Sequence, residues 1–455
     1  MTNGQINRRQ LLRGTAGAVA FTFVPGHVLG LAGAQSANEK LNIAAIGIGG
    51  MGASNLSACE SENIVALCDV DDDYAAKVFN KYPNAKKYKD FRKMLDKEGK
   101  NIDAVIIATP DHAHAVTAMA CLKRGKHVYC QKPLAHSIYE VRKLTEAARE
   151  AKVQTQMGNQ GHSSEEIRLL CEWIADGAIG PVHEVHVWTD RPVGGDPWSD
   201  FPIMARPKET PPVPATLDWD LWLGPAPHRP YHPIYCPLTW RGWCDFGTGA
   251  LGDMGCHIID PAFWALRLGS PARVEATTTH YQPEVASETY PRASIVRYEF
   301  PSRGEMPPVK LTWFDGRLMP PRPKELERGR RLDGSGALLI GERGTILHGT
   351  TGAEGVRIIP EEKMKAYKRP RKTLPRVARG QAGHEQDWVR ACKDGKPASS
   401  NFDYSGPLTE MVLLGVLAMR MKDTPLEWDP VNLKVTNVAD ANRYINPPYR
   451  EGWTL

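Results

Sequence analysis

Residues 41–60 read LNIAAIGIGGMGASNLSACE and join an apolar, strand-like run to a helix-like run through a glycine-rich turn. Gly47, Gly49 and Gly52 have the spacing GxGxxG. Glycine permits the tight turn and lets the backbone approach a pyrophosphate, while the following helix offers free N–H groups and a favourable dipole. The strand before and the helix after supply the context that an isolated GxGxxG lacks. The stretch predicts a dinucleotide-binding turn formed by Gly47, Gly49, Gly50, Met51 and Gly52.

A second apolar run, NIVALC (63–68), is followed by Asp69, which lies 17 residues beyond Gly52. That is close to the offset of roughly 20 residues at which a carboxylate holds the adenosine ribose hydroxyls. Because a carboxylate there repels a 2′-phosphate, the sequence favours NAD over NADP. The alternative is a doubly wound domain that holds no cofactor.

The alternation of strand-like and helix-like runs continues to Gly158, through residues 102–125, 127–130, 138–151 and 153–158. This pattern predicts a nearly parallel Rossmann sheet with helices on both faces and ligands at the carboxyl ends of its strands. We therefore expect cofactor contacts from the residues that follow these strands: Thr109, Pro110, His114, Gln131, Lys132 and Asn159.

Three pieces of the chain resemble the Gfo/Idh/MocA oxidoreductase family, in the family's order: AIGIGGMG (45–52), ATPDHAHAVTAMACLKRGKHVYCQKPLA (108–135) and GTGALGDMGCHIID (247–260). The resemblance implies an α/β protein, with an N-terminal Rossmann doubly wound sheet followed by an α/β domain that has a large open, mainly antiparallel sheet. It implies NAD(P)-dependent oxidation or reduction of a sugar, polyol or glycoside hydroxyl, and a homodimer or homotetramer.

The same resemblance implies a catalytic or substrate-orienting role for Lys132, in the family's Glu-Lys-Pro turn. Here Gln131 stands where the family has the glutamate. Gln131 carries no charge, but its amide can hydrogen-bond a nicotinamide ribose hydroxyl.

The family's Asp-x-x-x-His motif maps onto Asp253 and His257. Four residues of separation place both side chains on one face if the segment is helical. Oxidation of a hydroxyl needs a base near neutrality to take the proton, a role that suits histidine, and a nearby carboxylate can orient the ring. Packing or capping is the alternative for such a pair. The sequence predicts that Lys132, Asp253 and His257 are catalytic and bind substrate.

Beyond Gly158 the chain becomes rich in Trp, Pro and Tyr. Aromatic faces suit the apolar side of a sugar ring, although most of these tryptophans are expected in the core. Trp240 and Arg241 are predicted on the cofactor side of the pocket, and Trp243 on the substrate side. Gln160 and His162, just after the last Rossmann strand, are predicted to bind substrate, with a linker role as the alternative.

The first residues have another character: NRRQLLRGTAGAVAFTFVPGHVLGLAGAQ (7–35) carries the twin arginine Arg8-Arg9, a weakly apolar run and small residues. This is the outline of an export signal of the twin-arginine type, which predicts a periplasmic protein. The run is too short and glycine-rich for stable membrane insertion. The predicted organisation is a signal (1–35), an NAD-binding Rossmann domain (36–158) and a substrate-binding and oligomerisation domain (159–455). Its residues 401–420 predict a turn and an amphipathic helix that packs back on the Rossmann domain.

Composition excludes several other classes of protein. A net charge of +5 over 455 residues is too small for a nucleic-acid-binding protein, which needs a concentrated basic face. Nine scattered cysteines without a CxxC pair do not form a disulfide framework. Histidine pairs at 112/114, 183/186 and 228/232 have spacings that suit a metal, but each lacks a third ligand nearby, so we predict no metal site.

Two enzymatic hypotheses share one first step. In the first, an NAD-dependent oxidoreductase oxidises a hydroxyl, at C3, of a sugar or glycoside. In the second, a redox-neutral glycosidase oxidises C3, eliminates the C1 substituent, adds water and reduces C3 again. Because free NAD is not expected outside the cytoplasm, an exported enzyme needs a tightly bound cofactor that is reset in each cycle. A non-catalytic dinucleotide-binding sensor is the third hypothesis, and the combination of Lys132, Asp253 and His257 argues against it.

Overall fold

The glycine turn lies between β1 (Asn42–Ile46) and α2 (Gly50–Ala58), the first strand and helix of the Rossmann domain. The computed structural model describes residues 39–193, 200–279 and 282–455. The predicted export signal, residues 1–35, lies outside the described residues. Residues 41–455 form one unit, to which the rest of the description applies.

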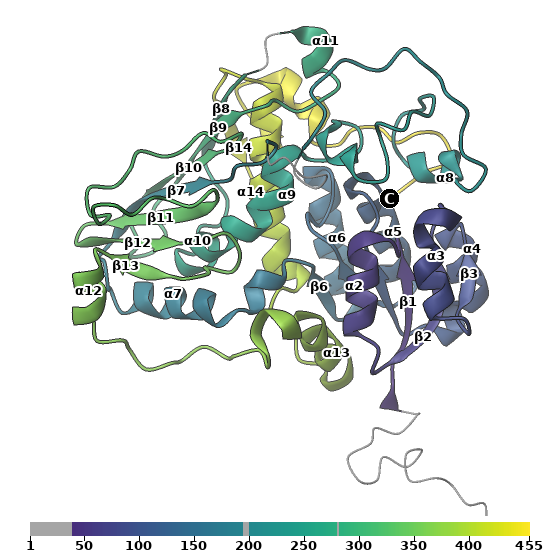
Figure 1. The fold of residues 1–455 in the computed structure, drawn as a ribbon, viewed down its shortest axis with the longest axis horizontal. Coiled ribbons are helices and arrows are strands. Elements are labelled where there is room, and N and C mark those ends of the chain that lie inside the picture. The colour runs from purple at the N-terminus through teal and green to yellow at the C-terminus, as the bar shows by residue number, and fades with distance from the viewer. Residues whose placement is uncertain (1–38, 194–199, 280–281) are drawn as a thin grey trace, which may run out of the picture. The chain divides into compact units, whose positions relative to one another are not determined.

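The first sheet has six parallel strands in the order β3-β2-β1-β4-β5-β6, visible on the right of Figure 1. Strands such as β4 are buried on both faces, which is why they read as continuous apolar runs rather than alternating ones. The strand order reverses between β1 and β4, and this is where a doubly wound sheet binds ligands. The remaining strands are β2 (Asn63–Cys68), β3 (Lys86–Tyr88), β4 (Ala104–Ile107), β5 (His127–Cys130) and β6 (Thr155–Met157).

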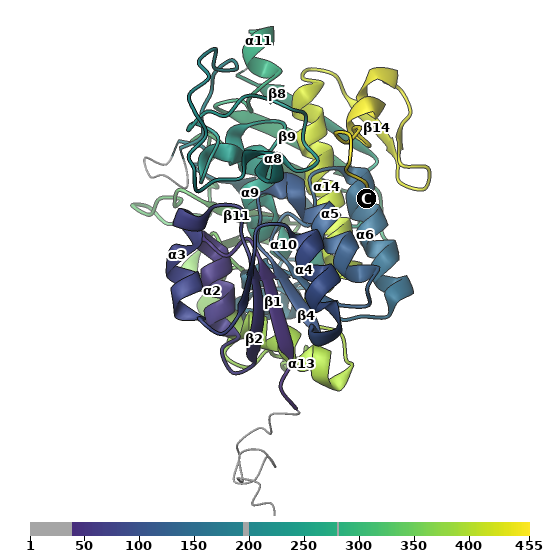
Figure 2. The same cartoon turned by 90° about the vertical axis from the view of Figure 1, so that its right-hand side faces the viewer.

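Helices connect these strands and cover both faces of the sheet (Figure 2). Their N-termini carry the expected caps: Asp71 accepts hydrogen bonds from the backbone at the start of α3, and Ser137 forms a reciprocal capping box with Glu140 in α6. The connecting helices are α3 (Asp72–Lys81), α4 (Phe91–Glu98) with a 3₁₀ turn at Gly99–Asn101, α5 (Asp111–Leu122) and α6 (Ile138–Ala151).

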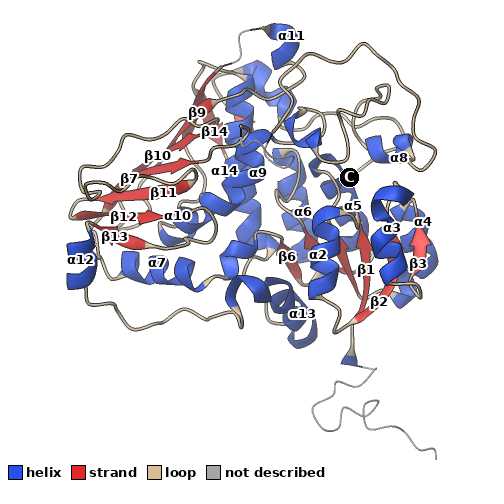
Figure 3. Ribbon diagram, viewed as in Figure 1, coloured by secondary structure: helices blue, strands red, loops and turns tan. Residues whose placement is uncertain are grey.

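The second sheet has nine strands in the order β13-β12-β11-β7-β10-β9-β8-β14-β15 (Figure 3). Among the described residues, β7 and β10 pair in parallel and the other neighbours pair antiparallel. The predicted large, mainly antiparallel sheet is thus confirmed. Its strands are β7 (Val182–Trp188), β8 (Arg273–Thr278), β9 (Ser294–Phe300), β10 (Val309–Phe314), β11 (Gly336–Gly341), β12 (Gly344–His348), β13 (Arg357–Ile359), β14 (Leu426–Asp429) and β15 (Lys434–Val435).

Helix α14 (Phe402–Arg420) lies between the two sheets (Figure 1). It packs on α6 and β6 of the Rossmann domain and, on its other side, on β8 and β9 of the second sheet. Nearly every residue from Ser405 to Met419 is buried. The expectation of an amphipathic helix is therefore wrong, because a helix covered from both sides needs no polar face.

The other helices and turns of the second domain surround this centre. They are η4 (Gln160–Ser163), α7 (Glu165–Ala175), α8 (Trp219–Leu223), η5 (Thr239–Gly242), α9 (Gly249–Ile258), α10 (Asp260–Ala265), α11 (Pro283–Ala286), α12 (Glu361–Ala366), η6 (Gly380–Gly383), α13 (His384–Asp394) and η7 (Ala439–Tyr444). Within the part of the chain that the structure describes, no helix has the length and apolar character to cross a membrane.

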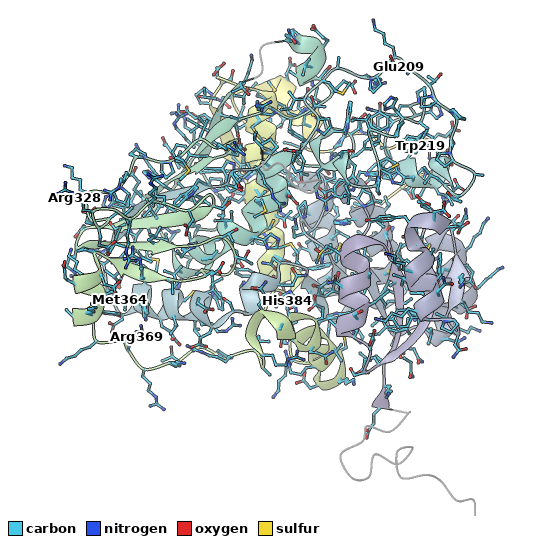
Figure 4. All side chains as sticks on the ribbon, viewed as in Figure 1. Glu209, Trp219, Arg328, Met364, Arg369 and His384 are labelled. Carbon is cyan, nitrogen blue, oxygen red and sulfur yellow. The ribbon has the colours of Figure 1, made fainter. Side chains whose placement is uncertain are left out.

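His384, labelled in Figure 4, begins α13, which joins the late part of the chain to the Rossmann domain. Its ring nitrogens lie 2.8 Å from the Met157 carbonyl oxygen and 2.7 Å from Ser163 Oγ. Helix α13 also contacts α2 and β5. Helix α13 therefore packs against α2, the helix that follows the glycine turn.

Candidate active site

A cavity of about 440 Å³ opens at the carboxyl ends of the Rossmann strands and extends to α9 of the second domain. Most of the residues predicted for the site line it: Gly47, Gly49, Gly50, Met51, Asp69, Thr109, Pro110, His114, Gln131, Lys132, Gln160, Trp240, Arg241, Asp253 and His257. The sequence prediction of one site shared by both domains agrees with this placement.

The glycine turn leaves no room for side chains. Gly47 has a φ of +76°, and a Cβ on it would lie 2.7 Å from the backbone of Ala108. A Cβ on Gly49 would lie 2.0 Å from the ring of Tyr74. The N-terminus of α2 has no capping side chain and no acidic residue in its first turn. The Gly52 N–H is bound to the Gly49 carbonyl oxygen, but no side chain caps the start of the helix, so the turn fits a pyrophosphate.

Gly52 does not line the cavity, although the sequence places it in the dinucleotide-binding turn. A Cβ on Gly52 would lie 1.9 Å from the carbonyl oxygen of Gly47. Its role is therefore close packing of α2 against the turn, which holds the turn in shape.

Asp69 follows β2 and is buried at the edge of the cavity. Its carboxylate accepts hydrogen bonds from the backbone N–H groups of Ile48 (2.8 Å) and Asp71 (3.1 Å). Burial raises the pKa of Asp69, and these backbone hydrogen bonds oppose that rise. The first of them ties Asp69 to the glycine turn, so the carboxylate and the turn are held in one geometry beside the predicted ribose position.

His114 braces the turn that carries Lys132. Its ring nitrogens lie 2.8 Å from the carbonyl oxygens of Pro133 and Thr109. Two carbonyl neighbours favour the protonated ring, but complete burial outweighs them and lowers the pKa of His114 to about 4. His114 lines the cavity as predicted, yet its polar atoms are engaged with the backbone, so it acts as a brace for the turn.

Lys132 and Asp253 meet at the inner end of the cavity. Lys132 Nζ lies 2.6 Å from Asp253 Oδ1 and 2.7 Å from the Asp253 carbonyl oxygen. Arg191 contacts the other carboxylate oxygen, and Arg241 Nε lies 3.5 Å from Oδ1. Burial by itself would raise the pKa of Asp253, but the three cations hold that pKa well below its usual range. Asp253 is therefore an anion held among cations.

His257 lies one helical turn after Asp253 on α9, as the spacing predicts. Burial and the neighbouring Lys132 lower the pKa of His257 to about 3, so the ring is neutral at physiological pH. Its Nδ1 is buried and has no hydrogen-bond partner among the described residues. Among the described residues no hydrogen bond joins His257 to Asp253, whose carboxylate binds Lys132 and Arg191, so the expectation that Asp253 orients the ring is corrected. The expectation of a pKa near neutrality is thus corrected, because burial and Lys132 disfavour the charged ring, and His257 is an uncharged base.

Two residues of the site were not predicted. Arg191 comes three residues after the end of β7, and nothing in the local sequence singles it out. Asp111 stands at the start of α5 inside the conspicuous stretch ATPDHAHAV, which was a usable signal. Thr248 Oγ1 donates to Asp111 Oδ2 (2.6 Å), and burial raises the pKa of Asp111 to about 7. This carboxyl group therefore exchanges its proton near neutrality at the wall of the cavity.

Asn159 and His162 do not reach the cavity. Their side chains are buried and bind Asp260, from Asn159 Nδ2 at 3.2 Å and from His162 Nδ1 at 3.0 Å. The His162 ring also stacks on Trp264, with a centroid distance of 4.5 Å. The predicted contacts of Asn159 with cofactor and of His162 with substrate are corrected to a role in the junction between the domains, because Asp260 takes their polar groups.

Trp243 is also outside the cavity. It is fully buried in an aromatic cluster and packs edge-to-face on Tyr235, with a centroid distance of 4.8 Å. The prediction that Trp243 binds substrate is corrected to a core role. Trp240 does line the cavity, and the Arg241 guanidinium lies over its ring at 4.2 Å. This stacking positions Arg241 beside Asp253.

Other buried polar atoms on the cavity wall lack a partner among the described residues. They are the hydroxyl oxygens of Thr109 and Thr117. Both oxygens are enclosed by the protein, so neither is offered to a molecule bound in the cavity. No group of three or more His, Cys, Asp or Glu side chains in the described ranges is arranged to hold a metal ion.

Comparison with known proteins gives one match for the Rossmann domain and one for the second domain. Residues 41–159 match the family model described as "Oxidoreductase family, NAD-binding Rossmann fold", and residues 172–300 match "Oxidoreductase family, C-terminal alpha/beta domain", both of the Gfo/Idh/MocA family. Together the two matches cover more than half of the chain.

The chain is similar to the myo-inositol 2-dehydrogenase of Thermotoga maritima, with 29% identity over 33% of this chain and 46% of that protein. It is similar to the levoglucosan dehydrogenase of Pseudarthrobacter phenanthrenivorans, with 24% identity over 54% of this chain and 56% of that protein. It is also similar to a glycosyl hydrolase family 109 protein of Saccharopolyspora erythraea, with 29% identity over 39% of this chain and 44% of that protein. The chain thus spans about half the length of the curated relatives it matches.

A solved structure of levoglucosan dehydrogenase in complex with NADH has the same fold. It aligns with a TM-score of 0.56 and 18% identity, covering 85% of this chain and 99% of that one. The match of residues 41–159 to an NAD-binding Rossmann fold identifies NAD as the cofactor, and the glycine turn described above is suited to bind it. The chain belongs to the Gfo/Idh/MocA oxidoreductase family, with an N-terminal NAD-binding Rossmann domain and a C-terminal α/β domain.

Proposed function

We propose that the protein oxidises a hydroxyl group, at C3, of a sugar or glycoside, using a tightly bound NAD. The observation that carries this proposal is the meeting of Lys132, Asp253 and His257 in one cavity whose other end is the glycine turn. The similarity to sugar and inositol dehydrogenases supports the substrate class.

Each residue has a role that follows from its position. His257 is neutral and lines the cavity, and its Nδ1 is enclosed, so its Nε2 takes the proton of the reacting hydroxyl. Lys132 donates a hydrogen bond to the same oxygen, which stabilises the negative charge that develops there. Asp253 holds Lys132 in place at 2.6 Å. Bound NAD supplies the acceptor for the hydride that leaves the carbon.

A redox-neutral glycosidase is the second candidate, and the similarity to a glycosyl hydrolase family 109 protein favours it. After oxidation at C3, the C2 proton is acidic and a base removes it. The C1 substituent leaves with the electron pair, water adds at C1, and C3 is reduced again. The net reaction is hydrolysis, and the cofactor ends in its starting state.

We propose, in addition, that the chain is exported to the periplasm by its twin-arginine signal and assembles as a dimer or tetramer. An exported enzyme finds no free NAD outside the cytoplasm. Its cofactor must therefore be bound before transport and returned to its starting redox state within the site. Both candidate reactions meet this need, the first if a second substrate is reduced in turn.

The first experiment is to purify the protein without added cofactor, denature it and quantify the released dinucleotide per chain. A one-to-one ratio is the expected result, and a ratio near zero would sink the claim of a tightly bound cofactor. Incubation with glycosides in deuterated water then separates the two reactions. Deuterium at C2 of the released sugar identifies the glycosidase, whereas oxidised sugar without C2 label identifies the oxidoreductase.

A further inference from the structure

A buried carboxylate lies behind the cavity and belongs to the late part of the chain. Glu385, the second residue of α13, is 7% exposed. Its Oε1 accepts hydrogen bonds from Asn55 Nδ2 (2.8 Å), Tyr129 OH (3.0 Å) and Gln160 Nε2 (3.3 Å). Among the described residues, no Lys or Arg forms an ion pair with Glu385. Neutral donors alone stabilise this buried group.

The network continues to the cavity through Asn55, which lies on α2 and is 1% exposed. Asn55 Oδ1 accepts a hydrogen bond from Gln131 Nε2 at 3.0 Å. Gln131 and Gln160 both line the cavity. Glu385 is thus connected to one cavity amide through Asn55 and to the other directly.

The direction of these hydrogen bonds follows from the chemistry of the carboxylate. An ionised carboxylate only accepts, so Asn55 must turn its NH₂ group toward Glu385. The carbonyl oxygen of Asn55 then faces Gln131, which must in turn donate its own NH₂ group. The carbonyl oxygen of Gln131 is left over, and no described residue donates to it. The orientation of the Gln160 amide is fixed as well, because its NH₂ group donates to Glu385 and to Tyr129 OH. Its carbonyl oxygen is then left for another donor.

Packing holds the Gln131 amide in the same orientation. A Cβ on Gly158 would lie 2.6 Å from Gln131 Nε2 and 2.8 Å from its Oε1. Glycine at position 158 therefore lets the backbone cover the flat face of the amide, while Asn55 holds its edge. An amide held at both face and edge keeps one orientation.

We propose that Glu385 is a positioning residue that fixes the polarity of the cavity: it makes Gln131 and Gln160 present carbonyl oxygens, so the molecule bound there must donate hydrogen bonds. The ribose hydroxyls and carboxamide of NAD are such donors. The inference concerns cofactor binding and holds for either candidate reaction.

We call the hydrogen-bonded series Gln131–Asn55–Glu385 the relay. The test exchanges the glutamine at one end of it for the glutamate at the other. In Gln131→Glu two acceptors, the introduced carboxylate and Asn55 Oδ1, face each other, and turning Asn55 only moves the conflict to Glu385. Adding Glu385→Gln supplies a donor at that end, so Asn55 reverses and both of its hydrogen bonds are restored. Gln160 and Tyr129, which donate to the same Oε1 in the natural protein, must then accept from the new NH₂ group. We expect Gln131→Glu to weaken NADH binding at least tenfold, Glu385→Gln by about threefold to tenfold, and the double variant to return within about threefold of the natural protein.

The readout is the dissociation constant for NADH, measured by calorimetry on protein freed of dinucleotide, with the melting temperature measured in parallel. Glu98→Gln is the matched control, because Glu98 accepts a hydrogen bond from Tyr88 OH (2.8 Å) on the Rossmann surface, away from the cavity. It is expected to leave the dissociation constant unchanged.

A double variant whose loss equals the product of the single losses overturns the inference. So do single variants that lower the melting temperature but leave NADH binding intact, because that result identifies a purely structural network. Should Gln131→Glu fail to fold, the double variant still decides: recovery of folded, NADH-binding protein is expected, and continued failure rules out the relay.

Discussion

Lys132 Nζ lies 2.6 Å from Asp253 Oδ1 and 2.7 Å from the Asp253 backbone carbonyl oxygen. One residue therefore binds the same ammonium group through both side chain and main chain. The contact joins the turn after β5 to α9, and with them the cofactor domain to the residue one turn before His257. The position of Lys132 relative to the base is thus set by a specific contact between domains.

Lys132→Met is expected to lower turnover about 10²–10⁴-fold, because it removes the hydrogen bond to the oxygen on which charge develops. The measurement is the rate at which the bound nicotinamide is reduced by a panel of sugars and glycosides. Lys123→Met is the control, since Lys123 is exposed and its Nζ donates to the Leu455 carbonyl oxygen. Equal rates for both variants would remove Lys132 from the mechanism.

Asp253→Asn is expected to lower the free energy of unfolding by about 3 kcal/mol, because it leaves Lys132 and Arg191 without their buried counter-charge. Denaturant unfolding at neutral pH measures this loss. Asp96→Asn breaks the exposed ion pair with Arg124 and is expected to cost less than about 1 kcal/mol. A loss as small for Asp253→Asn would show that the cations do not depend on this carboxylate.

The pH profile of the reaction tests the environment of His257. Burial lowers the pKa of His257 to about 3, so the base is already deprotonated at neutral pH. We expect kcat/KM to show no acid limb from this group between about pH 5 and pH 8. An acid limb centred near 6.5 that disappears in His257→Asn would mean that the ring titrates like an exposed histidine, contrary to this site.

His348 makes the stability of the fold depend on pH and is not among the residues that line the cavity. It is 2% exposed on β12, and burial lowers its pKa to about 4. Because the unfolded chain binds the proton more tightly, the contribution of His348 is present above about pH 6.5 and is lost as the pH falls toward 4. The loss is about 3 kcal/mol.

His348→Gln should therefore reduce the slope of the acid side of the stability curve by the contribution of one histidine, measured by denaturant unfolding at a series of pH values. His183→Gln, which removes an exposed histidine, is the control for the substitution itself. An unchanged slope in His348→Gln would contradict the assignment, whatever the absolute stability of the variant.

Replacement of Arg8 and Arg9 by lysine is expected to keep the full-length protein in the cytoplasm, because the twin-arginine route recognises that pair. Cell fractionation of a host that has this route measures the change. Periplasmic protein in equal amount from both forms would rule out this route of export, and with it the main reason for a sealed cofactor.

Patterns of neighbouring residues were sufficient for the Rossmann domain and its glycine turn, whereas the sheet of the second domain was expected from the family resemblance. The glycine turn, the buried strand runs and the position of Asp69 are local features whose geometry follows from the backbone. Lys132, Asp253 and His257 were predicted from motifs that resemble those of the Gfo/Idh/MocA family, and the structure places them in one cavity.

The remaining residues depend on contacts that no local pattern encodes. Asn55 and Glu385 are 330 positions apart in the chain, yet their side chains lie 2.8 Å apart. Trp243 and His162 occupy positions suited to ligand binding in sequence, and the packing of Tyr235 and Asp260 takes them into the interior. The sequence by itself determined which backbone turns and which chemical groups are present. Only the tertiary structure decided which groups face the cavity, because burial and hydrogen-bond satisfaction are properties of the packed whole.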